Sequence, residues 1–248
     1  MHQLALSMRL PDRASFESFL PGDNGAAVDT LRALAAGRRR DVVWLAGPAG
    51  SGKTHLLHAV VARCAQDAAA GYLPLAAPAP AAAAGAAPLA GVATLAPEVL
   101  EGWQGVRCLC LDDVPALFGD AAWERALFRL HREAEEQGIS LVLSGSESPA
   151  LVRPQLRDLA SRLGASTVCV LQPLDEAQQR EALRLRAHLR GLQLPDETLQ
   201  YLQRHMPRDM RSLYRLLDTL DEAALQAQRR LTVPFIRAVL ERSPPAAR

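Results

Sequence analysis

The most specific chemical signal in the sequence is a short glycine-rich run that ends in lysine and threonine. Glycines allow backbone N–H groups to surround phosphate oxygens, while Lys53 would reach the outer phosphates and Thr54 would bind Mg²⁺. Lys53 is also the only lysine among 28 basic residues, and a planar guanidinium would not fit such a loop in the same way. The run therefore predicts a site for ADP or ATP with Mg²⁺. It matches the phosphate-loop pattern G-x-x-x-x-G-K-[ST] at every position through Gly47, Pro48, Ala49, Gly50, Ser51, Gly52, Lys53 and Thr54.

Two neighbouring carboxylates and a pair of serines could complete this site. Asp112 and Asp113 follow the mostly apolar residues 106–111, so one carboxylate would lie near Mg²⁺ and the next could orient or activate water. Strands often end in aspartate, and the signal gains weight from the phosphate loop upstream. Ser146, or alternatively Ser144, follows another apolar run and could sense the terminal phosphate, although serine in a turn has a simpler explanation.

The elements that must position these residues are buried strands alternating with helices. Apolar runs of this length are typical of strands covered on both faces of a parallel sheet, whose carboxyl ends face a ligand crevice. Helical spacing predicts helices at 26–34, after Thr54, at 97–102 and in a segment that ends near Gly138. The predicted strands lie at 42–46, 72–75, 106–111, 139–143 and 167–171.

The alternation of strand and helix stops near residue 172, which predicts a domain boundary. We expect an α/β nucleotide-binding domain at 12–172, a helical domain at 173–242 and a tail at 243–248. Residues 76–91 are almost wholly alanine, proline and glycine, so we expect a mobile surface insertion. The helical domain would contain segments at 175–190, 196–205, 208–229 and 233–242.

Composition excludes several classes of protein. The 248 residues carry 28 basic and 27 acidic side chains, for a net charge of +1, which does not favour bulk nucleic-acid binding. The four cysteines lack zinc-type spacing, and Cys108 and Cys110 share one face of an apolar strand as ordinary buried thiols. Without a secretory segment or a membrane-length apolar run, we expect a soluble cytoplasmic protein with no membrane partner.

The first eleven residues form an extended pattern with alternating apolar side chains. Gln3, Leu4, Leu6 and Met8 could occupy pockets of another protein. A first strand or a disordered end explains the same pattern.

Eight sequence blocks together resemble AAA+ ATPase modules of the DnaA-related clade. Within that clade they most resemble the Hda family of regulatory inactivators of DnaA. The resemblance covers nearly the whole chain apart from the alanine–proline insertion, and the DLASRL, RDMRSLY and RRLTVPF blocks are more particular than the phosphate loop. The blocks are FLPGDN (19–24), GPAGSGKTHLLHAV (47–60), LAPEVLEGW (95–103), LCLDDV (109–114), DLASRL (158–163), QPLDE (172–176), RDMRSLYRLLDTLD (208–221) and AQRRLTVPFIRAVL (227–240).

The resemblance implies an α/β fold with a five-stranded parallel sheet flanked by helices, followed by an all-helical lid domain. It makes Arg162 the expected arginine finger that acts on a neighbouring molecule, and Arg211 the expected sensor 2 residue of the lid. Pattern alone favours a surface position for Arg162, and it explains Arg211 equally well as a surface residue or as a nucleotide contact. Residues 3–8 would bind the sliding clamp, the beta subunit of DNA polymerase III.

The implied function is to dock on DNA-loaded clamp and stimulate hydrolysis of ATP held by DnaA, which prevents re-initiation. DNA would be contacted only through the clamp, and we expect self-association. Ser146 stands where the family usually has an acidic residue, and Ala5 and Ser7 replace the usual serine and proline. A stand-alone ATPase such as a helicase loader is the alternative. A DNA-binding initiator is weaker, because the chain ends after the lid.

Overall fold

A computed structural model describes most of the two predicted domains. Gln3, Leu4, Leu6, Met8, the insertion at 76–91 and Arg211 lie outside the described residues, so their predicted roles stay predictions. The described residues are 14–75, 96–205, 212–214, 216–217, 219–220, 223 and 233–242.

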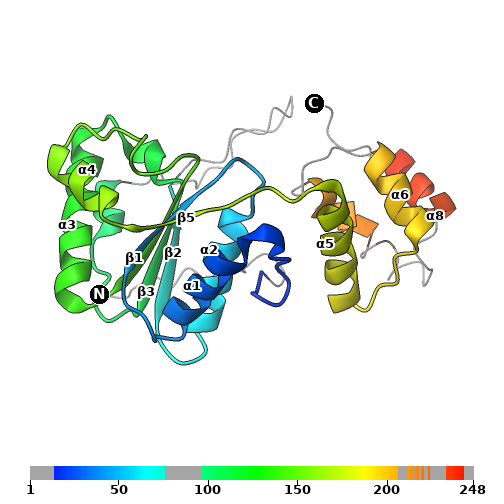
Figure 1. Cartoon of the computed structure of the whole chain (residues 1–248), viewed down its shortest axis with the longest axis horizontal. Helices are drawn as coiled ribbons and strands as arrows, with labels where there is room; N and C mark the ends of the chain where they lie inside the picture. Colours follow the sequence, from blue (N-terminus) through cyan, green and yellow to red (C-terminus); the bar gives the residue numbers. More distant parts are fainter. Residues whose placement is uncertain are drawn as a thin grey trace. The chain divides into compact units, whose positions relative to one another are not determined.

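The five strands form one parallel sheet in the order β2-β3-β4-β1-β5 (Figure 1). This confirms the predicted fold class. The first strand has the predicted bounds, the other strands differ from the predictions by one or two residues, and the fourth continues to Gly145 instead of ending at residue 143. The bounds are β1 Val42–Ala46, β2 Ala70–Pro74, β3 Cys108–Asp112, β4 Ser140–Gly145 and β5 Thr167–Val170.

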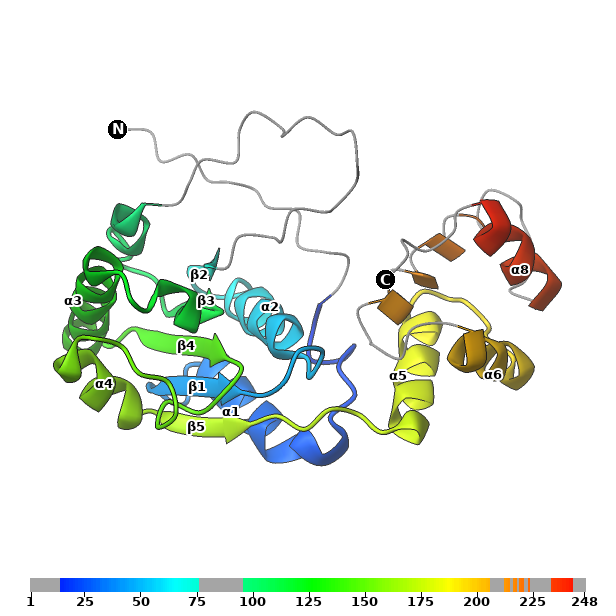
Figure 2. The ribbon, with the colours of Figure 1, turned by 90° about the horizontal axis from the view of Figure 1, so that it is seen from above.

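Helices cover both faces of the sheet. Figure 2 shows α1 (Gly25–Ala35) and α2 (Lys53–Cys64) on one face, with α3 (Ala121–Gln137) and α4 (Arg157–Gly164) on the other. These helices cover the side chains of the central strands β1, β3 and β4, which explains their continuous apolar runs, whereas Val168 and Val170 of the edge strand β5 stay exposed. Short 3₁₀ turns precede α1 and flank β3: η1 Gly22–Asn24, η2 Pro97–Leu100 and η3 Val114–Leu117.

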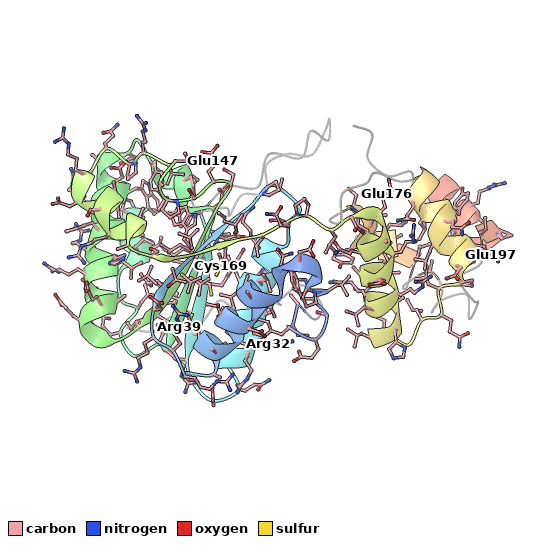
Figure 3. All side chains as sticks on the ribbon, viewed as in Figure 1. Arg32, Arg39, Glu147, Cys169, Glu176 and Glu197 are labelled. Carbon is pink, nitrogen blue, oxygen red and sulfur yellow. The ribbon has the colours of Figure 1, made fainter. Side chains whose placement is uncertain are left out.

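The core between the sheet and α3 is built around Trp44 on β1. Its ring is fully buried, and its indole N–H donates to the backbone oxygen of Glu147 at 2.8 Å. Glu147, labelled in Figure 3, lies two residues beyond the end of β4, so this bond ties the loop after β4 to the neighbouring strand. Ser144 lies near the end of β4, and Ser146 lies in this loop.

Asn24 is bound to the chain that follows the carboxyl end of β5. Its amide donates to the backbone oxygen of Gln172 at 3.0 Å, and the Gln172 N–H donates back to the Asn24 side-chain oxygen at 2.7 Å. The Asn24 side chain and the Gln172 backbone thus exchange two hydrogen bonds, and Asn24 is buried. This gives the last residue of the FLPGDN block a structural role beside β5.

A second compact unit begins at Pro173 and also includes residues 17–23. Its helices are α5 (Glu176–Leu189), α6 (Asp196–His205) and α8 (Val233–Arg242), and the described positions between 212 and 220 are helical as well. Asp175 and Gln178 form a capping box at the start of α5. The core of this unit contains Leu183, Leu199, Leu213 and Ile236. In the described residues, no helix has the length and apolar character needed to span a membrane.

Candidate functional site

The phosphate loop connects the end of β1 to the start of α2. Gly52 has a φ of 96°, which is unfavourable for other residues and lets the chain enter α2 with Lys53 as its first residue. A side chain at Gly47 would place its Cβ 2.8 Å from both the Leu171 backbone oxygen and the Ser51 hydroxyl. The tight turn and the helix N-terminus give the geometry in which backbone N–H groups bind phosphate.

Lys53 and Ser51 provide polar groups inside this turn. The Lys53 ammonium donates to the backbone oxygens of Gly47 at 2.5 Å and Pro48 at 3.0 Å. Burial lowers the pKa of Lys53, an effect that the charges of Asp112 and Asp113 oppose. The buried Ser51 hydroxyl has no hydrogen-bond partner within the described part of the chain. These groups fit an anion such as a nucleotide phosphate.

Asp112 lies at the centre of a hydroxyl network at the carboxyl end of β3. Its Oδ2 accepts hydrogen bonds from the Thr54 hydroxyl at 2.7 Å and from the Tyr72 phenol at 2.9 Å. Its Oδ1 accepts from the Ser144 hydroxyl at 2.5 Å. Adjacent hydroxyl and carboxylate oxygens are the hard ligands that Mg²⁺ prefers. Thr54 and Asp112 therefore fit the predicted metal site.

Asp113 and the two serines occupy different environments. Asp113 is exposed and has a φ of 63°, and its backbone N–H donates to the Ser144 hydroxyl at 2.8 Å. Ser144 is therefore shared between Asp112 and Asp113 and is fully buried. Ser146 is exposed in the loop beyond β4. The structure thus joins Ser144, the alternative in the sequence prediction, to the carboxylate network.

Arg162 lies on α4 and faces α3. Its guanidinium pairs with the Glu135 carboxylate at 2.7 Å and lies over the Phe128 ring, with its central carbon 5.2 Å from the ring centre. The Arg162 side chain is 33% exposed and that of Glu135 is 66% exposed. Both partners are thus accessible, and a second molecule could compete with Glu135 for the guanidinium.

Glu124 fixes the approach to α4. Its carboxylate is buried and accepts backbone N–H bonds from Gly119 at 2.9 Å, Gln155 at 3.0 Å and Leu156 at 2.7 Å. Burial alone would raise the pKa of Glu124, but these N–H bonds outweigh it and lower the pKa. The residue connects the start of α3 to the segment that enters α4.

Sequence reasoning did not identify Tyr72, Glu124 or Glu135 as part of these arrangements. Tyr72 reaches Asp112 only because β2 and β3 are adjacent, with Tyr72 opposite Cys110. Glu124 and Glu135 lie on α3 and reach partners in or just before α4 only because these two helices pack together. The helical spacing of Glu124 with Leu127 and Phe128, which places a carboxylate on an apolar helix face, is the signal that could have identified Glu124.

The second unit matches a known family. A sequence model of the lid domain of Hda matches residues 175–240. This stretch includes α5, α6 and most of α8.

Solved structures share the fold of nearly the whole chain. Domain III of the replication initiation protein DnaA from Thermotoga maritima superposes with a TM-score of 0.70 at 21% identity, covering 94% of this chain and 98% of that one. AMPPCP-bound DnaA from Aquifex aeolicus gives 0.65 at 18% identity, covering 87% and 67%. The RuvB Holliday junction branch migration motor of Thermotoga maritima gives 0.55 at 19% identity, covering 90% and 67%. The fold is therefore that of AAA+ proteins.

Proposed function

We propose that this chain, a DnaA-related AAA+ protein with an Hda-type lid domain, is a regulatory adaptor that switches off the initiator DnaA. It would hold ADP or ATP, dock on the DNA-loaded sliding clamp and stimulate hydrolysis of the ATP bound to DnaA. The observation that carries the proposal is the match of residues 175–240 to the Hda lid domain, because many AAA+ proteins share the remaining fold.

The phosphate loop supports the nucleotide part of this proposal. Lys53 and the backbone N–H groups of the loop would bind the phosphates, and Thr54 and Asp112 would hold Mg²⁺. Bound Mg²⁺ would neutralise phosphate charge. DnaA, whose fold this chain shares, binds AMPPCP in the Aquifex aeolicus structure. In an adaptor, this nucleotide would maintain the binding-competent conformation, and Asp113 would be available to orient water.

Arg162 supports the proposal that this protein stimulates hydrolysis of the ATP bound to DnaA. A guanidinium supplied by a second molecule stabilises the charge that develops during phosphoryl transfer, and it contributes about a thousandfold or more to the rate. Arg162 is accessible, and the carboxylate that pairs with it, that of Glu135, is exposed. It could therefore exchange Glu135 for the phosphates of the ATP bound to DnaA.

Two further contacts are proposed from resemblance and lie outside the described residues. Gln3, Leu4, Leu6 and Met8 would bind the clamp, and Arg211 would approach the nucleotide from the lid. With Ala5 and Ser7 inside the clamp segment, we expect the clamp interaction to be weaker than that of the usual peptide. Such a role would place the protein in the cytoplasm.

The test is a reconstituted assay with clamp loaded on primed DNA, DnaA and labelled ATP. We expect little hydrolysis by this protein alone and rapid conversion of DnaA-ATP to DnaA-ADP when clamp, DNA and protein are all present. Gln3→Ala should reduce this conversion without changing nucleotide binding. Absence of stimulation by the wild-type protein would refute the adaptor proposal.

The second candidate is a stand-alone ATPase such as a helicase loader. The Thr54–Asp112 hydrogen bond and the exposed Asp113 at the end of β3 favour it, because a hydrolytic site needs these groups. The same assay separates the two functions. Fast turnover without clamp or DnaA would support the ATPase.

A further inference from the structure

Three hydroxyl groups from three different elements bind the carboxylate of Asp112. Thr54 comes from α2, Ser144 from β4 and Tyr72 from β2. Thr54 belongs to the phosphate loop and Ser144 to the neighbouring central strand. Tyr72 comes from an edge strand, and the phosphate-loop pattern does not account for its presence.

The ring of Tyr72 is held so that its hydroxyl meets Asp112. Tyr72 lies opposite Cys110 in the β2–β3 pair, and Cys110 and Asp112 share a face of β3 because they are two residues apart. The buried imidazole of His58 on α2 covers the ring, with ring centres 4.1 Å apart and planes at 36°. The phenol therefore has a defined direction before any ligand binds.

The Tyr72 hydroxyl donates to the same Asp112 oxygen that the Thr54 hydroxyl contacts. Oδ2 of Asp112 accepts from Thr54 at 2.7 Å and from Tyr72 at 2.9 Å. A metal ion that engages the Thr54 hydroxyl would take a lone pair of its oxygen, which does not require the hydrogen bond from Thr54 to Asp112 to break. The Tyr72 bond can stay, since it needs only one lone pair of Oδ2. Together with Ser144 on Oδ1, it keeps the carboxylate from rotating.

We propose that Tyr72 is a positioning residue of the magnesium site: its hydroxyl orients Asp112 and thereby increases the affinity of the nucleotide-bound protein for Mg²⁺. The inference rests on the nucleotide-binding part of the proposed function and is independent of DnaA and the clamp. Groups that orient a metal ligand typically contribute about 10- to 100-fold to metal affinity. The lower end of that range is expected here, because Ser144 still holds the other oxygen.

The experiment is a Mg²⁺ titration of the full chain with a fluorescent ADP analogue, starting in EDTA. Tyr72→Phe keeps the ring against His58 and removes only the hydroxyl. We expect the Mg²⁺ concentration that gives half-maximal tightening to rise about tenfold, with unchanged affinity in EDTA and an unchanged melting temperature. Tyr201→Phe, a change in α6 of the second unit, is the matched control and should behave as wild type.

Each alternative outcome has a distinct meaning. An unchanged Mg²⁺ midpoint in Tyr72→Phe overturns the proposal and leaves the adaptor function standing. A parallel fall in EDTA affinity and melting temperature also overturns it, because Tyr72 would then serve only the stability of the fold. If the wild-type protein does not bind the analogue at all, both this inference and the nucleotide part of the proposed function are wrong.

Discussion

Asp112 and Arg162 are the two charged groups on which the proposed function depends, and the fold holds them in opposite ways. Asp112 ends a central strand and accepts hydrogen bonds from three hydroxyls on three elements. Arg162 lies near the surface and is paired with one carboxylate that is 66% exposed. An exposed ion pair contributes only about 0.2–1 kcal/mol. The comparison indicates that the Asp112 carboxylate is held in place for a ligand bound by its own chain. The Arg162 guanidinium, in contrast, can leave its carboxylate and pair with a group of another molecule.

Glu124 supports the region that bears Arg162. Its three backbone N–H bonds hold the segment before α4 against the start of α3. The helix that bears Arg162 is therefore firmly placed, while the side chain itself is easily released. Rigid backbone combined with a replaceable side-chain partner suits a residue that acts on another molecule.

The largest expected effect concerns Lys53 in the phosphate loop. Lys53→Ala should weaken nucleotide binding at least about a hundredfold, because charged hydrogen bonds to phosphate contribute about 1.5–3 kcal/mol each. Lys53→Arg should not restore binding, since the guanidinium does not fit the turn. Fluorescent ADP titration measures both variants. Affinity within threefold of wild type in Lys53→Ala would contradict the assigned phosphate site.

The next largest effect concerns Glu124, which holds the segment before α4 in place. Glu124→Ala leaves the backbone N–H groups of Gly119, Gln155 and Leu156 without the buried carboxylate that accepts their hydrogen bonds, so the free energy of unfolding should fall by roughly 3 kcal/mol in urea denaturation. Because the folded pKa of Glu124 is lowered, its stabilisation is complete above its usual pKa and is lost as pH falls through the lowered value. Wild-type stability should therefore decrease in acid more steeply than that of Glu124→Gln. Equal slopes for the two proteins would refute this role.

The smallest expected effect concerns the ion pair between Arg162 and Glu135. Glu135→Gln removes the carboxylate that holds Arg162, so stimulation of DnaA should increase, by up to about fivefold at low salt. Glu136→Gln is the matched control, because Glu136 pairs with Arg132 on the same helix at similar exposure. A decrease in Glu135→Gln would show that Glu135 positions Arg162 for its partner instead of competing with it.

The sequence allowed the architecture and the phosphate loop to be predicted, because each depends on residues close together in the chain. The apolar run before Gly47 predicts β1, and glycine spacing with Lys53 and Thr54 predicts the loop. Strand ends were less certain. Ser144 continues β4 because its backbone pairs with Leu45 of β1, and the bond to Asp112 satisfies its buried hydroxyl.

Side-chain partners from distant elements could not be predicted in the same way. The strand β4 is buried at all six positions, so alternation gives no sign of which serine faces Asp112. Tyr72 meets Asp112 through the order and register of the strands, and Glu135 meets Arg162 through the packing of two helices. These contacts depend on tertiary geometry, which local patterns do not contain.

The most direct test of the central claim compares Arg162→Ala with Arg157→Ala in the reconstituted DnaA assay. Both change an arginine of α4, and Arg157 is exposed at the first turn of that helix. We predict that Arg162→Ala returns ATP hydrolysis to the basal rate of DnaA, while nucleotide affinity and melting temperature stay at wild-type values and Arg157→Ala remains active. Wild-type stimulation by Arg162→Ala would contradict the account.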